Sequence, residues 1–203
     1  MTRTIEMLFD VSAPNAYLAW YPLKAVAART GAAITVTPVF LGGMHRLTGN
    51  SPPLFRDAEI KGKVEYAALE FERFRALHGL DRFVMHPALP FNSILCQRVL
   101  TAGGNDEERH SIVEALLPAV WERSIDCADA GAVAAELAEA GLDAERLLTA
   151  AGSEAVKKQL ADNTAQAVER GAFGIPTFFA GTEMWFGKER LGQVERYLGG
   201  GLP

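Results

Sequence analysis

The first forty residues carry the pattern that most restricts what this chain can fold into. Thr4–Phe9 is a short apolar run that ends at Asp10, apolar side chains then recur at helical spacing as far as Gly31, and residues 32–40 alternate and are rich in β-branched types. A strand, a helix and a second strand of this combined length form a right-handed unit with parallel strands. We therefore expect an α/β protein that begins with such a unit.

The rest of the chain is mostly helical until a second pair of strands near its end. Residues 41–53 (LGGMHRLTGNSPP) are irregular and predict a loop over a site. Two short strands, TFFAG and EMWFG, meet at Gly181 and Thr182 and predict a β-hairpin. Helices are predicted over about residues 56–78, 91–102, 105–124, 129–140, 143–151 and 153–170, with a last one over about 191–198.

This order of elements predicts a thioredoxin-like α/β fold with a large α-helical insertion. Residues 1–40 and 153–203 would form the thioredoxin-like domain, and residues 41–152 would form a loop plus the inserted α-helical domain. The length of 203 residues is about 1.4 typical domains, which fits one domain that carries an insertion.

Charge and hydropathy exclude several classes of protein. Twenty Lys and Arg against 25 Asp and Glu leave a net charge of -5, without a block of like charges, so we expect no nucleic acid partner. No apolar run is long enough to span a membrane, and the first apolar run meets Asp10 and Pro14 too early for a secretory signal. The expectation is a cytoplasmic protein that does not bind membranes.

The cysteines and tryptophans point to the interior rather than to a cofactor. Cys96 and Cys127 are 31 residues apart and lack a CxxC partner, which speaks against a disulfide framework, a zinc site or a redox pair. We expect buried thiols. Trp20, Trp121 and Trp185 are predicted to anchor the core, with the lining of an aromatic pocket as the alternative.

The turn that contains Ser12 is the first candidate for chemistry. A turn between a central strand and its helix presents unpaired backbone N–H groups and the positive end of the helix dipole, which favour an anion or a thiolate. The Ser12 hydroxyl could donate a hydrogen bond to such a thiolate. The alternative is that Ser12 only caps the helix.

Three further candidates lie elsewhere along the chain. A cis peptide bond before Pro176 would expose the Ile175 backbone to an extended peptide ligand, although this proline could instead start an edge strand. Glu189, in the segment 187–190 (GKER), could complement the dipole of the last helix or pair with a ligand ammonium group. Asn50 could be a turn residue or a binding residue.

Taken together, seven motifs in order identify a family resemblance over about 190 residues. The motifs are FDVSAPNAYLAW, TGNSPP, KVEYAALEFERF, PALPFNSILCQR, AVWERSIDCAD, ERGAFGIPTFF and EMWFGKERL. Each is weak alone, but jointly they are specific. The chain resembles the 2-hydroxychromene-2-carboxylate isomerases, which are similar to kappa-class glutathione transferases and belong to the DsbA-like branch of the thioredoxin superfamily.

The resemblance implies a glutathione cofactor bound in the thioredoxin-like half, beneath a helical roof that covers a pocket for a small aromatic substrate. The resemblance implies that Asn50 contacts glutathione. It also implies that Ile175, which precedes a cis Pro176, pairs with the backbone of glutathione. Lys188 and Glu189 stand where the family places residues that bind the γ-glutamyl end. The resemblance also implies a homodimer and a role in aromatic compound catabolism.

One position departs from the family pattern. The family has serine directly before the proline at the start of the first helix, whereas here Ala13 holds that place and Ser12 precedes it. A shift of one residue redirects a side chain by about 100° in a helix and about 180° in a strand. Either the turn is re-registered so that Ser12 substitutes, or backbone N–H groups and the helix dipole stabilise the thiolate alone, or the activity is lost or changed.

Three functions remain open on this reading. The first is a glutathione-dependent isomerase that acts on an aromatic or chromene carboxylate through transient thiolate addition, with Ser12 at the reacting sulfur. The second is a kappa-like glutathione transferase that conjugates electrophiles. The third is a non-catalytic glutathione-binding protein. The absence of cysteine from the SAPN turn argues against disulfide exchange in all three.

Overall fold

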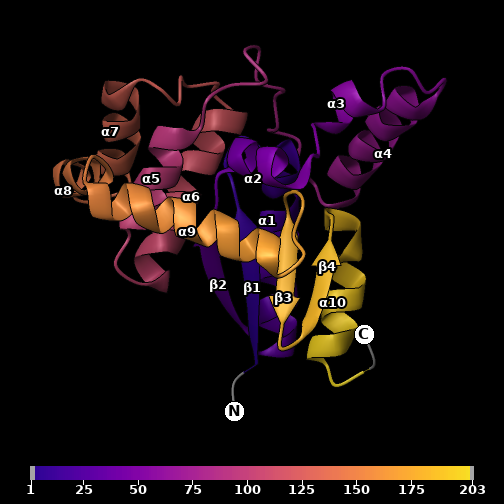
Figure 1. The fold of residues 1–203 in the computed structure, drawn as a ribbon. Helices are drawn as coiled ribbons and strands as arrows, with labels where there is room; N and C mark the ends of the chain where they lie inside the picture. Colours follow the sequence, from indigo (N-terminus) through magenta and orange to yellow (C-terminus); the bar gives the residue numbers. More distant parts are fainter. Residues whose placement is uncertain (1–2, 202–203) are drawn as a thin grey trace.

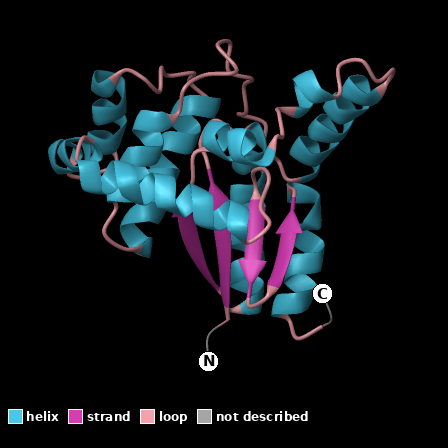
Figure 2. Cartoon of the chain, in the orientation of Figure 1, coloured by secondary structure: helices cyan, strands magenta, loops and turns pink. Residues whose placement is uncertain are grey.

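The computed structural model describes residues 3–201 and contains a mixed sheet of four strands in the order β2-β1-β3-β4 (Figures 1 and 2). β1 (Thr4–Phe9) runs parallel to β2 (Ala33–Pro38) and antiparallel to β3 (Thr177–Ala180), and β3 pairs antiparallel with β4 (Glu183–Phe186). The predicted thioredoxin-like class is therefore confirmed, with strands from both ends of the chain in one sheet.

The register brings four chain segments to one end of this sheet. Thr177 pairs with both Leu8 and Phe186, and Phe9 pairs with Pro38. The residues that follow β1, β2 and β4, and those that precede β3, consequently lie at the same end, the upper end in Figure 1. This is the end at which the predicted site residues lie.

Helices cover both faces of the sheet. α9 (Glu154–Glu169) crosses in front of it in Figure 1, while α1 (Pro14–Thr30) and α10 (Leu191–Leu198) lie behind it. α1 ends at Gly31, whose φ of 68° is the left-handed conformation that glycine adopts without steric cost. The three tryptophans are buried, which confirms them as core residues.

The inserted helices gather beside the β2 edge (Figure 1). Three of them begin with a side chain that accepts a hydrogen bond from a backbone N–H of the first turn: Asn105 for α6, Asp129 for α7 and Asp143 for α8. The predicted ranges differ from the observed ones by at most three residues at either end. The helices are α5 (Ile94–Ala102), α6 (Asp106–Trp121), α7 (Ala130–Glu139) and α8 (Ala144–Ala151).

The predicted loop over residues 41–53 is wrong, because most of it is helical. α2 (Leu41–Thr48) begins where the Leu41 N–H donates to the buried Asp10 carboxylate at 2.7 Å, and it ends at Gly49. A Cβ on Gly42 or Gly43 would lie 3.2 Å from the Phe40 ring. Glycine therefore lets the helix pack against its own start, and these tertiary contacts override its low helix propensity.

The predicted helix over residues 56–78 is also divided. α3 (Pro53–Arg56) is a single turn, and α4 (Lys63–Leu77) starts after Gly62, whose φ is 80°. The Asp57 carboxylate, between the two helices, forms ion pairs with Arg56 and Lys63 and so stabilises the break between α3 and α4. In Figure 1 the α3–α4 segment stands apart from the sheet, above β4.

Cys96 and Cys127 are buried free thiols, as predicted. They are also neighbours: the Cys96 Sγ lies 3.7 Å from the Cys127 carbonyl oxygen. A hydrogen bond with the Cys127 thiol, followed by burial, holds the pKa of Cys96 well above its ordinary value. Such a thiol is a poor nucleophile.

Candidate active site

The turn that joins β1 to α1 is organised by a buried carboxylate. Asp10 is 0% exposed. Its Oδ1 accepts the Ser12 N–H at 2.9 Å and the Ser12 hydroxyl at 2.8 Å, and its Oδ2 accepts the Leu41 N–H. Burial raises the pKa of the Asp10 carboxyl, and the hydrogen bonds from Leu41 and Ser12 act in the opposite direction. Asp10 thus ties the turn to the start of α2.

Ser12 does not cap α1. The N-cap residue is Ala13, with no side-chain hydrogen bond to the helix, because the Ser12 hydroxyl donates backward to Asp10 instead. The capping alternative is therefore wrong. Whether this hydroxyl reaches a bound sulfur stays a prediction.

The backbone N–H groups of the turn are nearly all engaged. Pro14 has no N–H, which leaves that of Asn15 as the one amide of residues 11–16 without an acceptor among the described residues. At the amino end of a 17-residue helix, this N–H and the helix dipole favour an anion. The engaged groups are Val11 N–H to Gln97 Oε1, Ser12 N–H to Asp10 Oδ1, Ala13 N–H to Asp10 O and Ala16 N–H to Ala13 O.

Two side chains of the inserted helices hold the turn in place. Gln97, on α5 and 1% exposed, donates from Nε2 to the carbonyls of Phe9 at 2.7 Å and Val39 at 2.8 Å. Its Oε1 accepts the Val11 N–H, and the Trp121 indole N–H donates to the Val11 carbonyl at 2.8 Å. Sequence reasoning missed Gln97, although an amide within the apolar stretch ILCQRVL could have signalled a buried hydrogen-bonding role.

The segment before β3 lies at the same end of the sheet as this turn, because Thr177 pairs with Leu8. The peptide bond between Ile175 and Pro176 is cis, as the resemblance implied. The Pro176 carbonyl accepts the Gly187 N–H at 2.9 Å, and a Cβ on Gly174 would lie 2.8 Å from the Phe186 ring. The segment is thus packed closely against the end of β4.

Asn50 connects α2 to the same segment. Its Nδ2 donates to the Phe173 carbonyl at 2.8 Å, and its Oδ1 accepts from the Ser51 N–H and from Arg56 Nη1. The side chain therefore connects the end of α2, the end of α3 and the cis-proline segment. Its predicted contact with glutathione is not tested by these bonds.

Lys188 and Glu189 lie at the end of β4, in the short 3₁₀ helix η1 (Lys188–Arg190) that precedes α10. Lys188 is 4% exposed, forms an ion pair with Glu189 Oε1 and lies 5.0 Å from the centre of the Phe74 ring of α4. The Glu189 side chain is 51% exposed. The lysine charge is thus compensated internally, while the carboxylate stays open to a ligand cation.

Aromatic side chains fill the space between the turn and α4. The rings of Phe83 and Trp121 stack with centres 5.4 Å apart, and Tyr17 and Phe71 lie 5.3 and 5.0 Å from Phe83. Phe83 and Trp121 are buried, while Phe71 is partly exposed. An aromatic surface therefore borders the turn on the side of the inserted helices.

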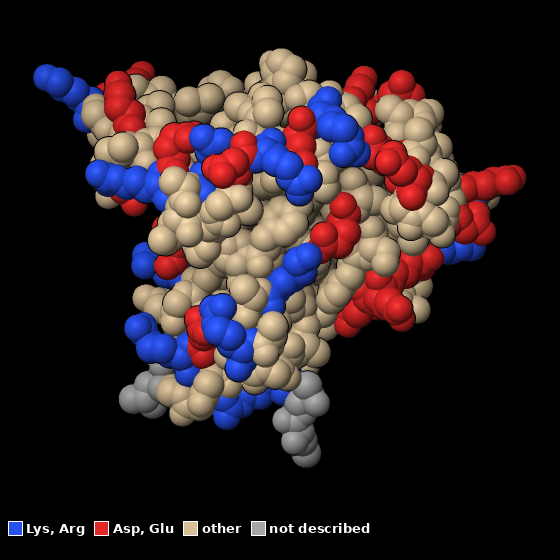
Figure 3. All heavy atoms as spheres, turned by 180° about the vertical axis from the view of Figure 1, so that it is seen from behind, with Lys and Arg blue, Asp and Glu red and all other residues tan. Residues whose placement is uncertain are grey.

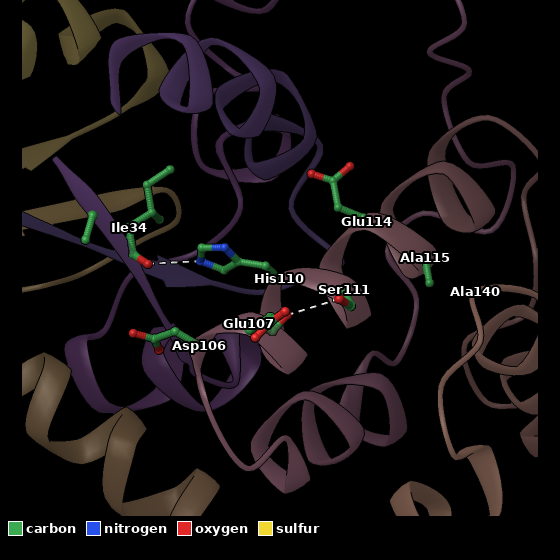
Figure 4. A pocket seen from close by; sticks show the side chains of 9 residues that line it. Ile34, Asp106, Glu107, His110, Ser111, Glu114, Ala115 and Ala140 are labelled. Carbon is green, nitrogen blue, oxygen red and sulfur yellow. Dashed lines mark hydrogen bonds between the residues drawn. The ribbon is translucent and has the colours of Figure 1, made fainter. Parts of the chain in front are cut away.

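A groove on the other side of the molecule does not belong to this site (Figure 4). Asp106, Glu107, His110 and Glu114 of α6 line it, and the His110 ring bonds the Ile34 carbonyl at 2.9 Å. Ile34 pairs with Ile5, near the opposite end of the parallel strands from Asp10.

The face seen in Figure 3 carries both charge signs, with acidic side chains gathered on one side. No helix of residues 3–201 is both long and apolar enough to cross a membrane.

Comparisons with known proteins place these features in a family. The model of the DsbA-like thioredoxin domain matches residues 4–199. The 2-hydroxychromene-2-carboxylate isomerase of Sphingobium xenophagum is 30% identical over 98% of this chain and 99% of its own length. Kappa 1 glutathione S-transferase of Rattus norvegicus is 26% identical over 97% of this chain and 91% of its own.

A solved structure agrees with this assignment. A 2-hydroxychromene-2-carboxylate isomerase with 28% sequence identity superposes with a TM-score of 0.83, covering 97% of this chain and 94% of that one. The likeness thus extends through the sheet and the inserted helices alike. The chain belongs to the DsbA-like thioredoxin family and, within it, to the family of 2-hydroxychromene-2-carboxylate isomerases.

Proposed function

We propose that this protein is a glutathione-dependent isomerase that converts an aromatic, chromene-type carboxylate between cis and trans forms. The observation that carries the proposal is the convergence at one end of the sheet. The Asn15 N–H at the start of α1 (Pro14–Thr30), which has no acceptor among residues 3–201, lies at the same end as the cis-proline segment and the exposed Glu189 carboxylate. Relatives named as this isomerase cover nearly the whole chain.

These residues fit a tripeptide with one thiol. The Ile175 backbone would pair with the backbone of the tripeptide, and the Glu189 carboxylate would bind the γ-glutamyl ammonium group. Asn50, just after α2, would also contact the tripeptide. The start of α1 would hold the sulfur as an anion. When bound, glutathione would supply a thiolate whose reversible addition to the opened chromene allows rotation about the bond made single.

The substrate would lie on the aromatic side of the turn. Phe71 of α4 (Lys63–Leu77), partly exposed beside buried Phe83, offers an apolar aromatic surface. Packing of an aromatic ring there would exclude water from the reacting bond.

The deciding assay measures isomerisation of 2-hydroxychromene-2-carboxylate with and without glutathione. Turnover that needs glutathione supports the proposal, and turnover that ignores it contradicts the proposal. S-methylglutathione is the matched control, because it keeps the peptide and lacks the thiol.

A kappa-like transferase is the second candidate, because kappa transferases are also related over nearly the full chain. Conjugation of a chloronitrobenzene by the same preparation would favour it. Ala13, in the place of the family serine, leaves a non-catalytic glutathione-binding protein as the third. Glutathione binding without turnover of either substrate would favour that one.

Cellular location and assembly stay predictions. We expect a cytoplasmic homodimer that works in aromatic compound catabolism, as the family resemblance implies. Light scattering of the purified protein measures the assembly directly, and a mass of about one chain contradicts the dimer.

A further inference from the structure

The Ser12 hydroxyl points its proton into the molecule. It donates to the Asp10 carboxylate at 2.8 Å, and Asp10 is fully buried while Ser12 is partly exposed. With its proton committed, the Ser12 oxygen can present only lone pairs to a ligand. Lone pairs repel a thiolate but accept a hydrogen bond from a neutral thiol. The observed arrangement is therefore matched to a thiol that still carries its proton.

We propose that Ser12 and Asp10 form a proton relay that deprotonates the thiol of glutathione bound at the start of α1. Ser12 Oγ takes the proton from sulfur as the S–H bond breaks, and the original hydroxyl proton passes to Asp10 Oδ1. The products are a thiolate, a serine hydroxyl that now donates to it, and a neutral carboxylic acid that donates to Ser12. The proton moves from glutathione to the protein, and none is exchanged with solvent. This inference rests on glutathione being the ligand.

The surroundings of Asp10 suit a group that changes its charge. Among the described residues, no Lys or Arg forms an ion pair with Asp10, so its negative charge is buried without a countercharge. A buried unpaired charge is costly, and accepting a proton removes that cost. The Leu41 and Ser12 amides hold the carboxyl group by its two oxygens, so it stays in place.

Other groups also face this carboxyl and would affect its titration. His45 of α2 interacts with its charge, and burial lowers the pKa of that histidine. Cys96 of α5 also interacts with this charge, and the Ser93 hydroxyl, which precedes α5, faces the carboxyl. Burial raises the pKa of Asp10 itself, in the direction that a proton acceptor near neutral pH needs.

The test is the number of protons released for each thiolate formed. Glutathione is added to the full-length protein in weakly buffered solution, the thiolate is followed by its ultraviolet absorbance, and released protons are followed with a pH indicator. The relay predicts thiolate formation with far less than one proton released, because Asp10 keeps the proton. One proton for each thiolate overturns the relay while leaving glutathione binding intact. An absence of glutathione binding overturns both the relay and the proposed function.

Two variants sharpen the result. Asp10→Asn and Ser12→Ala should each restore one released proton for every thiolate that still forms. Ser12→Ala removes a partly exposed hydroxyl, so it keeps the test available should Asp10→Asn disturb folding. An unchanged, low proton count in Ser12→Ala contradicts the relay.

The matched control is a carboxylate–hydroxyl pair outside the site. Asp106 of α6 accepts the Thr35 hydroxyl of β2 at 3.0 Å, beside the groove in Figure 4. Asp106→Asn should leave the proton count as in the wild type. S-methylglutathione should release no proton and form no thiolate, because it has no thiol.

Discussion

The β1–α1 turn and the α3–α4 segment meet at the same end of the sheet but are built in opposite ways. The turn is mostly buried, and Asp10, Gln97 and Trp121 fix its backbone through hydrogen bonds. α3 and α4 contain no buried residue and expose large apolar side chains, including Phe55 and Leu69. The contrast suggests a division of labour. The rigid turn would handle a sulfur that is the same in every cycle, and the open segment would meet the variable substrate.

Replacing Gln97, which fixes the β1–α1 turn, should cause the largest loss of stability. Gln97→Leu leaves one buried N–H and two buried carbonyls without that partner, so we expect a loss of roughly 3–5 kcal/mol in the free energy of unfolding. Urea denaturation measures it. Gln159→Leu, on an exposed face of α9, should stay within about 0.5 kcal/mol of the wild type. Equal effects of the two changes would show that the turn does not depend on α5.

A smaller disruption should follow from filling the space beneath the cis-proline segment. The added methyl group of Gly174→Ala would meet the Phe186 ring at 2.8 Å, and we expect a loss of about 1–3 kcal/mol. Gly192→Ala in α10 is the control: nothing lies within 4 Å of its Cβ, so helix propensity should stabilise the protein by about 0.5–1 kcal/mol. A Gly174→Ala variant as stable as the wild type contradicts this packing.

The two regions should also respond to pH with opposite signs. Burial raises the pKa of Asp10, so its contribution to stability is largest in acid and falls as the pH rises through that raised pKa. Hydrogen bonds from Arg56 and Lys63 hold the pKa of Asp57 well below its ordinary value. Its contribution is present at neutral pH and is lost below the usual carboxyl range.

Thermal unfolding across the pH range separates these two effects. Asp10→Asn should flatten the loss of stability towards higher pH, and Asp57→Asn should flatten the loss towards acid. If both variants flatten the same side of the profile, one of the two assignments is wrong.

The smallest change in stability is expected for substitutions in the α3–α4 segment. Phe55→Ser and Leu69→Ser should each change the free energy of unfolding by less than about 0.5 kcal/mol, because water already contacts both side chains. Calorimetry measures this change. A loss above about 1 kcal/mol would show that another surface, such as a second copy of the chain, covers these residues in solution.

Local patterns predicted the sheet and most helices, because apolar spacing and turn residues act over short distances. These patterns failed where contacts between residues far apart in the sequence determine the local structure. Leu41 starts a helix in a glycine-rich stretch because Asp10, 31 residues earlier, accepts its N–H. The Ser12 hydroxyl turns to Asp10 rather than to the helix, although serine is a favoured cap. The partners of Gln97 could not be assigned from sequence because Phe9, Val11 and Val39 lie 58 to 88 residues away.

The position of the site was easier to predict from the sequence than its chemistry. The order of the strands was enough to bring Ser12, Asn50, Pro176 and Glu189 to one end of the sheet. The direction of a hydroxyl proton and the ion pair that occupies Lys188 depend on side-chain packing, which spacing along the chain does not encode.

The bonds from Gln97 and Trp121 to the β1–α1 turn have a consequence for protein engineering. Exchanging α5 and α6 for the corresponding helices of a relative, to alter substrate choice, would remove both side chains together. Such a chimera should lose the proposed thiol chemistry as well as specificity, unless the graft carries an amide and an indole at the two matching positions.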